Sequence, residues 1–227
     1  MSNIKSIFKH FINTTLTLLV ILVPFVFDAQ QAMASENAWY AGVAYGRVIV
    51  DRNVEDFDDG SITSGRVDDK DSGWKVLMGY RYNRYLAVEF GRAELNNDLD
   101  NATTFTGQSN GSGNRYAAGK VTVDIRNPIA YYLAVEGRLP LAFGPPPYDN
   151  RLALYGKLGV TTWSATESIT DSNGRSENQK DGTDFMEGFG VEYKWPTGIT
   201  LKSGIEYYRE IVGEQYELHL MELTYDF

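Results

Sequence analysis

The last thirteen residues of the chain alternate between two kinds of side chain. From position 215 to position 227, every second residue falls on the same face of a strand. One face ends in four apolar side chains, Met221, Leu223, Tyr225 and Phe227. The opposite face ends in the polar side chains Glu222, Thr224 and Asp226. Ends of soluble chains tend to be polar and frayed, so a strand that stays apolar on one face up to its last residue favours a β-barrel in lipid.

The first 34 residues have the pattern of a secretory signal peptide. Two lysines precede an apolar run over residues 16–27, and Ala32 and Ala34 supply the small side chains that signal peptidase requires. A membrane-anchoring helix is the alternative, but it needs about 18 or more apolar residues, and Pro24 interrupts a run that is already shorter. We therefore expect cleavage after Ala34 and one mature domain over residues 35–227.

The charge and the cysteine content restrict what the mature chain can do. Loss of residues 1–34 removes two lysines and one aspartate, which changes the net charge from −9 to −10. An acidic protein repels phosphate backbones, so we expect no nucleic-acid partner. The chain has no cysteine, so its stability has to come from side-chain burial and backbone pairing.

Seven further segments alternate with a period of two, which brings the number of predicted strands to eight. They cover residues 39–50, 74–82, 85–95, 121–139, 152–160, 185–195 and 199–208. Within the fourth of these, Asn127 and Pro128 interrupt the alternation. Because proline cannot donate a hydrogen bond to a strand ladder, we expect a β-bulge at this point.

The connections between the predicted strands differ in length. Residues 83–84 and 196–198 have the composition of tight turns. Residues 51–71, 96–120 and 166–181 are polar and show no apolar period, so we expect them to be loops. Long loops at one end and short turns at the other are typical of outer-membrane barrels, whose long loops face the outside.

The sizes of the alternating side chains decide between two kinds of eight-stranded barrel. A soluble lipocalin-like barrel would bury its apolar face inside and present its polar face to water. Here bulky and aromatic side chains share the apolar face, whereas glycine, alanine and charged side chains share the other. Small and charged side chains suit a narrow lumen, and large apolar ones suit a wall that faces lipid. We therefore predict the fold class all-β, as an eight-stranded antiparallel transmembrane β-barrel.

Four stretches of the mature chain resemble the small OmpA/OmpX-type outer-membrane barrels. They are residues 39–43 (WYAGV), 79–89 (GYRYNRYLAVE), 154–160 (LYGKLGV) and the terminal Phe227. The resemblance covers residues 38–227 and implies a location in the outer membrane of a Gram-negative bacterium, among its lipids and lipopolysaccharide. It also implies that the barrel assembly machinery recognises Phe227 together with Leu223 and Tyr225. We expect the protein to be a monomer.

The face that we predict to line the lumen collects charges of both signs. Six of them are cationic: Lys75, Arg81, Arg138, Lys157, Lys194 and Lys202. Five are anionic: Glu89, Glu136, Glu192, Glu206 and Glu222. The interior of an eight-stranded barrel is only about wide enough for side chains, and an unpaired buried charge is costly. We therefore expect these groups to pair and to form a plug without a continuous water column.

Catalysis and metal binding find little support in the sequence. Lipid A deacylases and palmitoyltransferases are also eight-stranded barrels and need a nucleophile and a base at the outer edge. The mature chain has one histidine, His219, which lacks the His-x-Ser pairing of the deacylases and has the parity of the lipid-facing side chains. The acidic segments 56–60 and 68–71 do not have the spacing of a calcium-binding loop. We expect no catalytic residue, no cofactor and no metal site.

The function that we predict is that of a non-enzymatic integral outer-membrane protein that contributes to the integrity of the envelope. The alternative is an adhesin or host-factor binding protein, whose partner would be a host or surface ligand bound by residues 51–71, 96–120 and 166–181. A lipid A-modifying enzyme and a small pore are further alternatives, which the residues favour less.

Overall fold

The computed structural model describes residues 38–51, 62–66, 70–95, 102–107, 119–141 and 151–227. The predicted signal peptide, with Ala32 and Ala34, lies outside the described residues, and its cleavage stays a prediction. In the part of the chain that the structure describes, no helix is both long and apolar enough to cross a bilayer.

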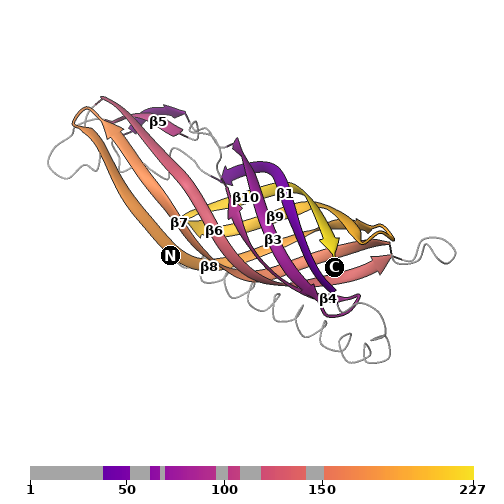
Figure 1. The fold of residues 1–227 in the computed structure, drawn as a ribbon. Coiled ribbons are helices and arrows are strands. Elements are labelled where there is room, and N and C mark those ends of the chain that lie inside the picture. The colour runs from indigo at the N-terminus through magenta and orange to yellow at the C-terminus, as the bar shows by residue number, and fades with distance from the viewer. Residues whose placement is uncertain (1–37, 52–61, 67–69, 96–101, 108–118, 142–150) are drawn as a thin grey trace, which may run out of the picture. The chain divides into compact units, whose positions relative to one another are not determined.

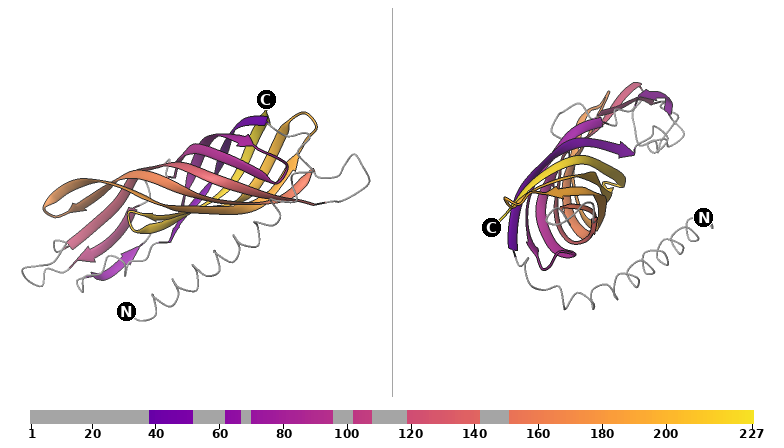
Figure 2. Two further views of the ribbon diagram at one scale, coloured as in Figure 1. Left: turned by 90° about the horizontal axis from the view of Figure 1, so that it is seen from below. Right: turned by 90° about the vertical axis from the view of Figure 1, so that its right-hand side faces the viewer.

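Eight antiparallel strands close into a ring (Figures 1 and 2). They are β1 (Ala38–Asp51), β3 (Lys70–Arg81), β4 (Leu86–Glu94), β6 (Gly119–Leu141), β7 (Leu152–Asp171), β8 (Gly174–Lys194), β9 (Ile199–Ile211) and β10 (Glu214–Asp226). Strands that are consecutive in this list are hydrogen-bonded neighbours in the ring. The last strand, β10, pairs with β1 through twelve residue pairs and closes the ring. The predicted eight-stranded barrel is confirmed.

Three strands of the ring continue beyond it and extend the same sheet outside the ring. β4 pairs with β6 only as far as Ile129, and β9 pairs with β8 only as far as Met186, whereas β6, β7 and β8 run on (Figure 1). Two further strands, β2 (Ile62–Arg66) and β5 (Ala102–Gly107), extend this sheet, because β2 pairs with β5 and β5 pairs with residues 119–124 of β6. We call the sheet β2-β5-β6-β7-β8 the outer sheet.

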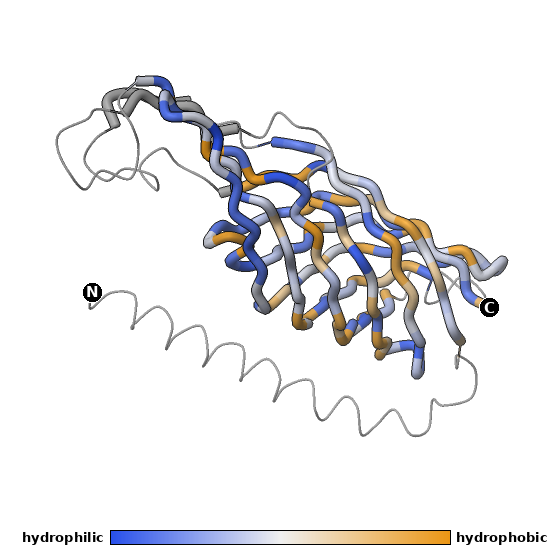
Figure 3. Tube along the Cα trace, turned by 60° about the vertical axis from the view of Figure 1, so that its left-hand side comes forward, coloured by the Kyte–Doolittle hydropathy of each residue, from blue (hydrophilic) through white to orange (hydrophobic). Residues whose placement is uncertain are grey.

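The strands of the ring turn alternate side chains inward and outward, and the exposed outward ones include many large apolar side chains. On β3, Lys75 is fully buried and Leu77 is 5% exposed, whereas Val76 between them is 41% exposed. This alternation follows from the strand period of two, and Figure 3 shows it as hydrophobic and hydrophilic residues that alternate along the ring. The predicted faces of the strands are confirmed.

Two tight turns lie at the end of the ring that also holds Ala38 and Phe227, which we call the terminal end. Between β3 and β4, Asn83 Oδ1 accepts hydrogen bonds from the backbone N–H groups of Tyr85 (2.8 Å) and Leu86 (2.9 Å). Between β8 and β9, Gly198 has a φ of +86°, in the left-handed region that favours glycine. Both predicted turns are confirmed, and the opposite end of the ring is called the loop end.

The predicted bulge in β6 is confirmed. Asn127 has a φ of +49°, and the pairing of β6 with β7 shifts between Arg126 and Ile129. The Leu95 N–H, where β4 ends, donates a hydrogen bond to the carbonyl oxygen of Pro128 (3.0 Å). The extra residue in the bulge reverses the alternation of β6. Odd-numbered side chains point inward on the N-terminal side of the bulge, and even-numbered ones point inward on its C-terminal side.

The prediction that residues 166–181 form a loop is wrong. β7 continues to Asp171, β8 begins at Gly174, and Asp171 Oδ1 accepts a hydrogen bond from the Asn173 N–H (2.8 Å) in the turn between them. Side chains on both faces of this hairpin are mostly polar, so they leave no period of two in hydrophobicity. The backbone ladder between β7 and β8 nevertheless runs without interruption.

The other two predicted loops contain strands as well. β2 lies within residues 51–71 and β5 lies within residues 96–120, and the ends of these ranges belong to β1, β3 and β6. The remaining residues of both ranges lie outside the described part of the chain, as does most of the connection from β6 to β7.

Candidate functional site in the barrel interior

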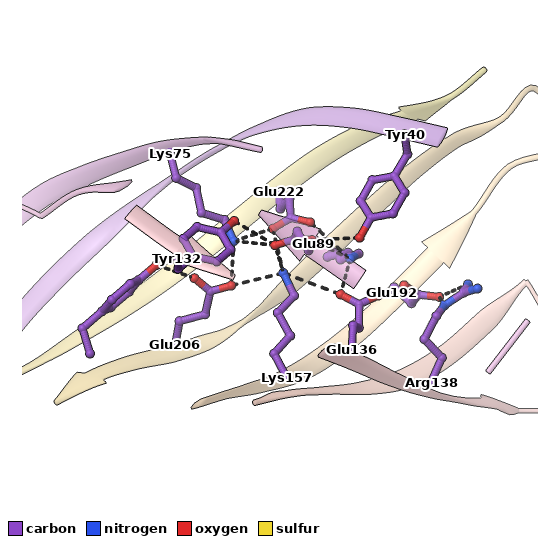
Figure 4. Close-up of polar contacts among 12 residues, drawn as sticks. Tyr40, Lys75, Glu89, Tyr132, Glu136, Arg138, Lys157, Glu192, Glu206 and Glu222 are labelled. Atoms are coloured by element: carbon purple, nitrogen blue, oxygen red, sulfur yellow. Dashed lines mark hydrogen bonds and ion pairs between the residues drawn. The ribbon is translucent and has the colours of Figure 1, made fainter. Parts of the chain in front are cut away.

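The middle of the lumen holds seven charged side chains that come from six strands. None of them is more than 1% exposed. We call this set the central cluster: Lys75, Glu89, Glu136, Lys157, Lys202, Glu206 and Glu222. Alternate residues of a strand face the same side, and each of these side chains is buried inside the ring. Figure 4 shows the contacts among them and labels all of them except Lys202.

Each ammonium group of the central cluster lies against carboxylates from other strands. Lys75 Nζ is 2.6 Å from Glu206 Oε1 and 2.8 Å from Glu222 Oε2. Lys157 Nζ is 2.7 Å from Glu89 Oε1, and Lys202 Nζ is 2.6 Å from Glu136 Oε2. The pairs therefore connect strands that are two or three places apart in the ring.

Tyrosine hydroxyl groups supply further hydrogen bonds to the carboxylates. Glu89 accepts from the hydroxyl groups of Tyr40 (3.1 Å) and Tyr132 (2.8 Å), and Glu206 accepts from that of Tyr208 (2.9 Å). Three ammonium groups face four carboxylates in the cluster, so these neutral donors help to stabilise the negative charge. Tyr40, Tyr132 and Tyr208 have the inward parity of their strands in the sequence, but parity does not show which carboxylate each of them reaches.

The remaining lumen charges pair at the terminal end. Arg138 Nε lies 2.6 Å from Glu192 Oε1. Arg81 Nη1 lies 2.5 Å and Lys194 Nζ 2.8 Å from Asp226 Oδ2. Asp226 was missing from the predicted set, although it shares the face of Glu222 on β10. With Asp226 included, the structure brings six cations and six anions together in the lumen.

Three carboxylates of the central cluster lie close enough to one another to be compared with a metal site. Oxygen atoms of Glu89, Glu206 and Glu222 all lie within 4.8 Å of one another. Lys157 Nζ approaches all three, at 2.7, 3.3 and 3.4 Å. The ammonium group occupies the position between the oxygens and would repel a divalent cation, so the arrangement fits an ion-pair network.

The loop end of the lumen is filled by apolar side chains. Those from β1, β9 and β10 include Val48, Val50, Ile211, Tyr216 and Leu218, each at most 1% exposed. They pack together with Leu95 and Met186. The lumen thus has two layers, a charged one that reaches the terminal end and an apolar one at the loop end. Val48, Val50, Tyr216 and Leu218 have the inward parity of their strands in the sequence. Ile211 has the outward parity of β9, and it is buried after the positive φ of Glu210 (+49°).

His219 lies outside the lumen. It is on the outward face of β10, opposite Arg47 of β1, and its Nε2 is 3.5 Å from Glu217 Oε2. Of the acidic segments considered for a metal, 56–60 lies outside the described residues. In 68–71 only Lys70 and Asp71 are described, and an Asp71 carboxylate oxygen accepts a hydrogen bond from the Ser72 N–H at 2.6 Å.

The three residues predicted as an assembly signal lie together on the outward face of the last strand. Leu223, Tyr225 and Phe227 are 50%, 55% and 65% exposed. The Phe227 N–H donates a hydrogen bond to the Trp39 carbonyl oxygen (2.9 Å), so the end of the chain is joined to the start of β1.

Comparison with known proteins gives one family and a set of similar structures. The family described as outer membrane protein beta-barrel domain matches residues 18–225. The crystal structure of Ail, the attachment invasion locus protein of Yersinia pestis, is 15% identical, with a TM-score of 0.47, over 86% of this chain and 100% of that one. The N-terminal β-barrel domain of OprF from Pseudomonas aeruginosa is 13% identical, with a TM-score of 0.48, over 85% and 100%. No curated protein sequence matches.

Proposed function

Since this chain belongs to the outer membrane protein β-barrel domain family, we propose that it contributes to the integrity of the outer membrane in which it lies, without catalysing a reaction. Its wall is an apolar band for lipid, and its interior is a sealed plug that gives the barrel rigidity. The protein thereby acts as a scaffold that holds its outer sheet above the membrane. The barrel assembly machinery is the partner that would insert it.

One observation carries this proposal: the charges of the lumen bind one another. Each of the seven side chains of the central cluster is at most 1% exposed. Each ammonium group of the cluster lies within 2.8 Å of a carboxylate oxygen. A reaction or a permeation path would need polar groups that can turn to a substrate or to water. Groups held in mutual ion pairs favour a stabilising role.

The test is a deletion of the gene in its own host. Loss of the protein should increase the entry of large hydrophilic antibiotics that an intact outer membrane excludes, and the wild-type gene should restore exclusion. A matched strain would carry a variant with Phe227 deleted, to ask whether the protein must be assembled to act. Unchanged exclusion in the deletion strain, with the protein expressed in the parent, would overturn the proposal.

The outer sheet favours a second candidate function, that of an adhesin or host-factor binding protein. β7 and β8 extend beyond the ring as one continuous hairpin, and β5 and β2 add to it at the side of β6 (Figure 1). A sheet that projects from the membrane is a rigid support for contacts with other molecules.

Shortening the hairpin tests this second function. Residues 164 and 181 are cross-strand partners. Removal of residues 164–181 and closure by a two-residue turn would therefore keep the ring. Binding of bacteria to host cells or serum proteins that is lost in this variant would support an adhesin. Equal binding by both forms would argue against it.

A further inference from the structure

Beyond the ring, one side of β8 has no neighbouring strand among the described residues. β9 leaves β8 at the pair of Tyr208 with Met186, whereas β8 stays paired with β7 as far as Gly174. Residues 174–179 are all exposed. The stretch 174–185 contains no proline, and its ladder with β7 has no bulge. Prolines and bulges protect the edges of sheets, so this side of β8, which we call the free edge, can accept another strand.

The free edge consists of the backbone groups of odd-numbered residues. At the terminal end, the Lys194 N–H donates a hydrogen bond to the carbonyl oxygen of Arg151, beside β7 (2.8 Å). The next N–H, that of Trp195, donates to the carbonyl oxygen of Ile199 on β9 (2.8 Å). Successive residues of an antiparallel strand direct their backbone groups to opposite neighbours, and the ladder of β7 with β8 has no shift. Odd-numbered residues of β8 therefore face β9 in the ring and the free edge beyond it.

Phe185 marks where the free edge begins. Its N–H is the first that points to this edge beyond the ring, and it donates a hydrogen bond to Asp184 Oδ1 (2.7 Å). A side chain thus satisfies the backbone group nearest to β9. In the described part of the chain, the odd-numbered residues from 175 to 183 have no strand beside them at this edge. Their stretch is longer than an ordinary strand of about 5–6 residues.

The charges along the free edge fit those of a second copy of this chain. When two identical strands pair antiparallel about a two-fold axis, one register places Arg175 opposite Asp181 and, by symmetry, Asp181 opposite Arg175. The same register places Glu177 opposite Gln179. Of the two neighbouring registers with the same hydrogen-bonding pattern, one places Glu177 opposite Asp181 and the other places Glu177 opposite itself. Like charges directly opposite each other destabilise paired strands, so the charges favour the first register.

The ion pairs within one copy do not prevent this contact. Arg175 pairs with Glu177 of its own chain, but the two side chains are 42% and 52% exposed. An exposed ion pair contributes little to stability, so Arg175 is available to a carboxylate of a second copy. Lys180 points to the other face, where it pairs with Glu167, and in the favoured register it lies opposite the uncharged Ser176.

We propose that two copies of this chain bind each other through the free edges of their outer sheets. Strand addition of this kind joins two sheets by backbone hydrogen bonds, and the side chains set the register. The joint ladder covers residues 174–182 of both copies and adds about eight such bonds. Because the paired strands run in opposite directions, the two rings lie at opposite ends of the joint sheet. The second copy therefore belongs to a facing outer membrane, and within one membrane the protein stays the expected monomer.

An introduced cysteine tests the register, because the chain has no cysteine of its own. In the proposed register Asn178 lies opposite Asn178 of the second copy. Such even-numbered positions form non-hydrogen-bonded pairs, whose Cα atoms lie about 4.5 Å apart, a separation that a disulfide can span. The experiment uses purified protein in detergent, which lets two barrels meet end to end. The Asn178→Cys variant should form a covalent dimer there on mild oxidation.

The matched control is Ser176→Cys, which lies two residues away on the same face and is exposed as well. Its two copies would lie about 13 Å apart along the ladder, too far for a disulfide, so we expect it to stay monomeric. Equal yields of dimer from the two variants would overturn the register. Absence of a dimer from Asn178→Cys would overturn the pairing itself.

An exchange of charges tests the contact without a disulfide. Arg175→Asp and Asp181→Arg should each weaken self-association about tenfold in analytical ultracentrifugation, because two cross-strand pairs of opposite charge become pairs of like charge. The double variant has the same charges in exchanged places and should associate like the wild type. Equal association of the single and double variants would contradict the proposal, and so would a dimer that persists after removal of residues 164–181.

The inference goes beyond both proposed functions, since neither of them involves a second copy of the chain. Antibiotic exclusion in the deletion strain and binding to host cells are measured separately from self-association. Each of the three proposals can therefore fail alone.

Discussion

Arg81 and Asp226 form an ion pair across 145 positions of the sequence, with Arg81 Nη1 2.5 Å from Asp226 Oδ2. Arg81 is the last residue of β3 and is fully buried, and Asp226 is the last residue of β10. Lys194 shares the same carboxylate oxygen. One aspartate near the end of the chain therefore neutralises two cations from different strands at the terminal end of the lumen.

Asp226→Asn should destabilise the barrel strongly, because it leaves the buried Arg81 without an anion. Breaking a buried pair by removal of one partner costs about 3–5 kcal/mol. The control is Glu94→Gln, since the side chains of Arg92 and Glu94 are 29% and 25% exposed and a pair at the surface contributes about 0–1 kcal/mol. Urea unfolding in lipid vesicles gives both free energies. Equal losses for the two variants would contradict the expected role of Asp226.

The wild-type barrel should show no large, steady conductance in a planar bilayer. Glu89→Ala or Glu206→Ala should lower the unfolding temperature. Each substitution removes a carboxylate that is paired with a buried ammonium group, that of Lys157 for Glu89 and that of Lys75 for Glu206. Neither should open a pore, since the apolar layer with Leu218 still fills the loop end of the lumen. Stable channel steps from the wild-type protein would refute the closed lumen and favour diffusion of small solutes.

Leu218→Ala should test the apolar layer directly. Leu218 is fully buried inside the ring, and removal of a buried leucine side chain costs about 2–5 kcal/mol. The control is Leu133→Ala on β6, where the leucine is 54% exposed on the outward face. We expect a smaller loss there because the replaced side chain contacts lipid, which fills the space. Similar unfolding free energies for the two variants would mean that the lumen at the loop end is loosely packed.

Deletion of Phe227 should impair assembly. Its side chain lies outward and its backbone N–H closes the ring onto Trp39. Less protein in the outer-membrane fraction, without the change of gel mobility on heating that is typical of folded barrels, is the expected result. Phe185→Ala is the control, because Phe185 is also outward, at 70% exposure, but lies far from the chain end. A wild-type amount of heat-modifiable protein after deletion would show that the terminal aromatic residue is dispensable.

Amide hydrogen exchange should separate the outer sheet from a loop. Residues 164–171 and 174–181 are paired with each other throughout, so their amides should exchange much more slowly than those of an unpaired polar segment. The turn at Ser172 and Asn173 should exchange fast and serves as the internal reference. Fast exchange over the whole of 166–181 would support the loop that the sequence predicts.

Lipid explains which parts of the fold could be predicted from the sequence. On the strands of the ring one face must be apolar, so Trp74, Val76 and Met78 alternate visibly with Lys75 and Leu77. In the outer sheet both faces can be polar, and residues 166–181 carry no such signal. The backbone ladder and polar contacts such as the ion pair between Lys180 Nζ and Glu167 Oε2 (3.3 Å) hold this hairpin, and neither requires a period of two in hydrophobicity.

The lumen could be predicted in kind but not in detail. Parity placed eleven charged residues inside, and all of them face the interior in ion pairs. Parity also places Asp226 and Tyr132 inside, but only the register of the strands shows that Asp226 reaches Arg81 and that Tyr132 reaches Glu89. Such long-range partners depend on how far each strand slides against the next.

The pairing of β1 with β10 sets the order of events when the barrel forms. Tyr40 faces Asp226 and Asp51 faces Gln215, so the seam joins the first strand of the ring to the last. Until β10 has been synthesised, β1 and β9 each have an edge of unpaired N–H and C=O groups, and each such group costs several kcal/mol in hydrocarbon. A partly made chain therefore has no stable place in the bilayer. Folding and insertion have to be completed together, with closure of the seam as the step that makes the membrane-embedded state permanent.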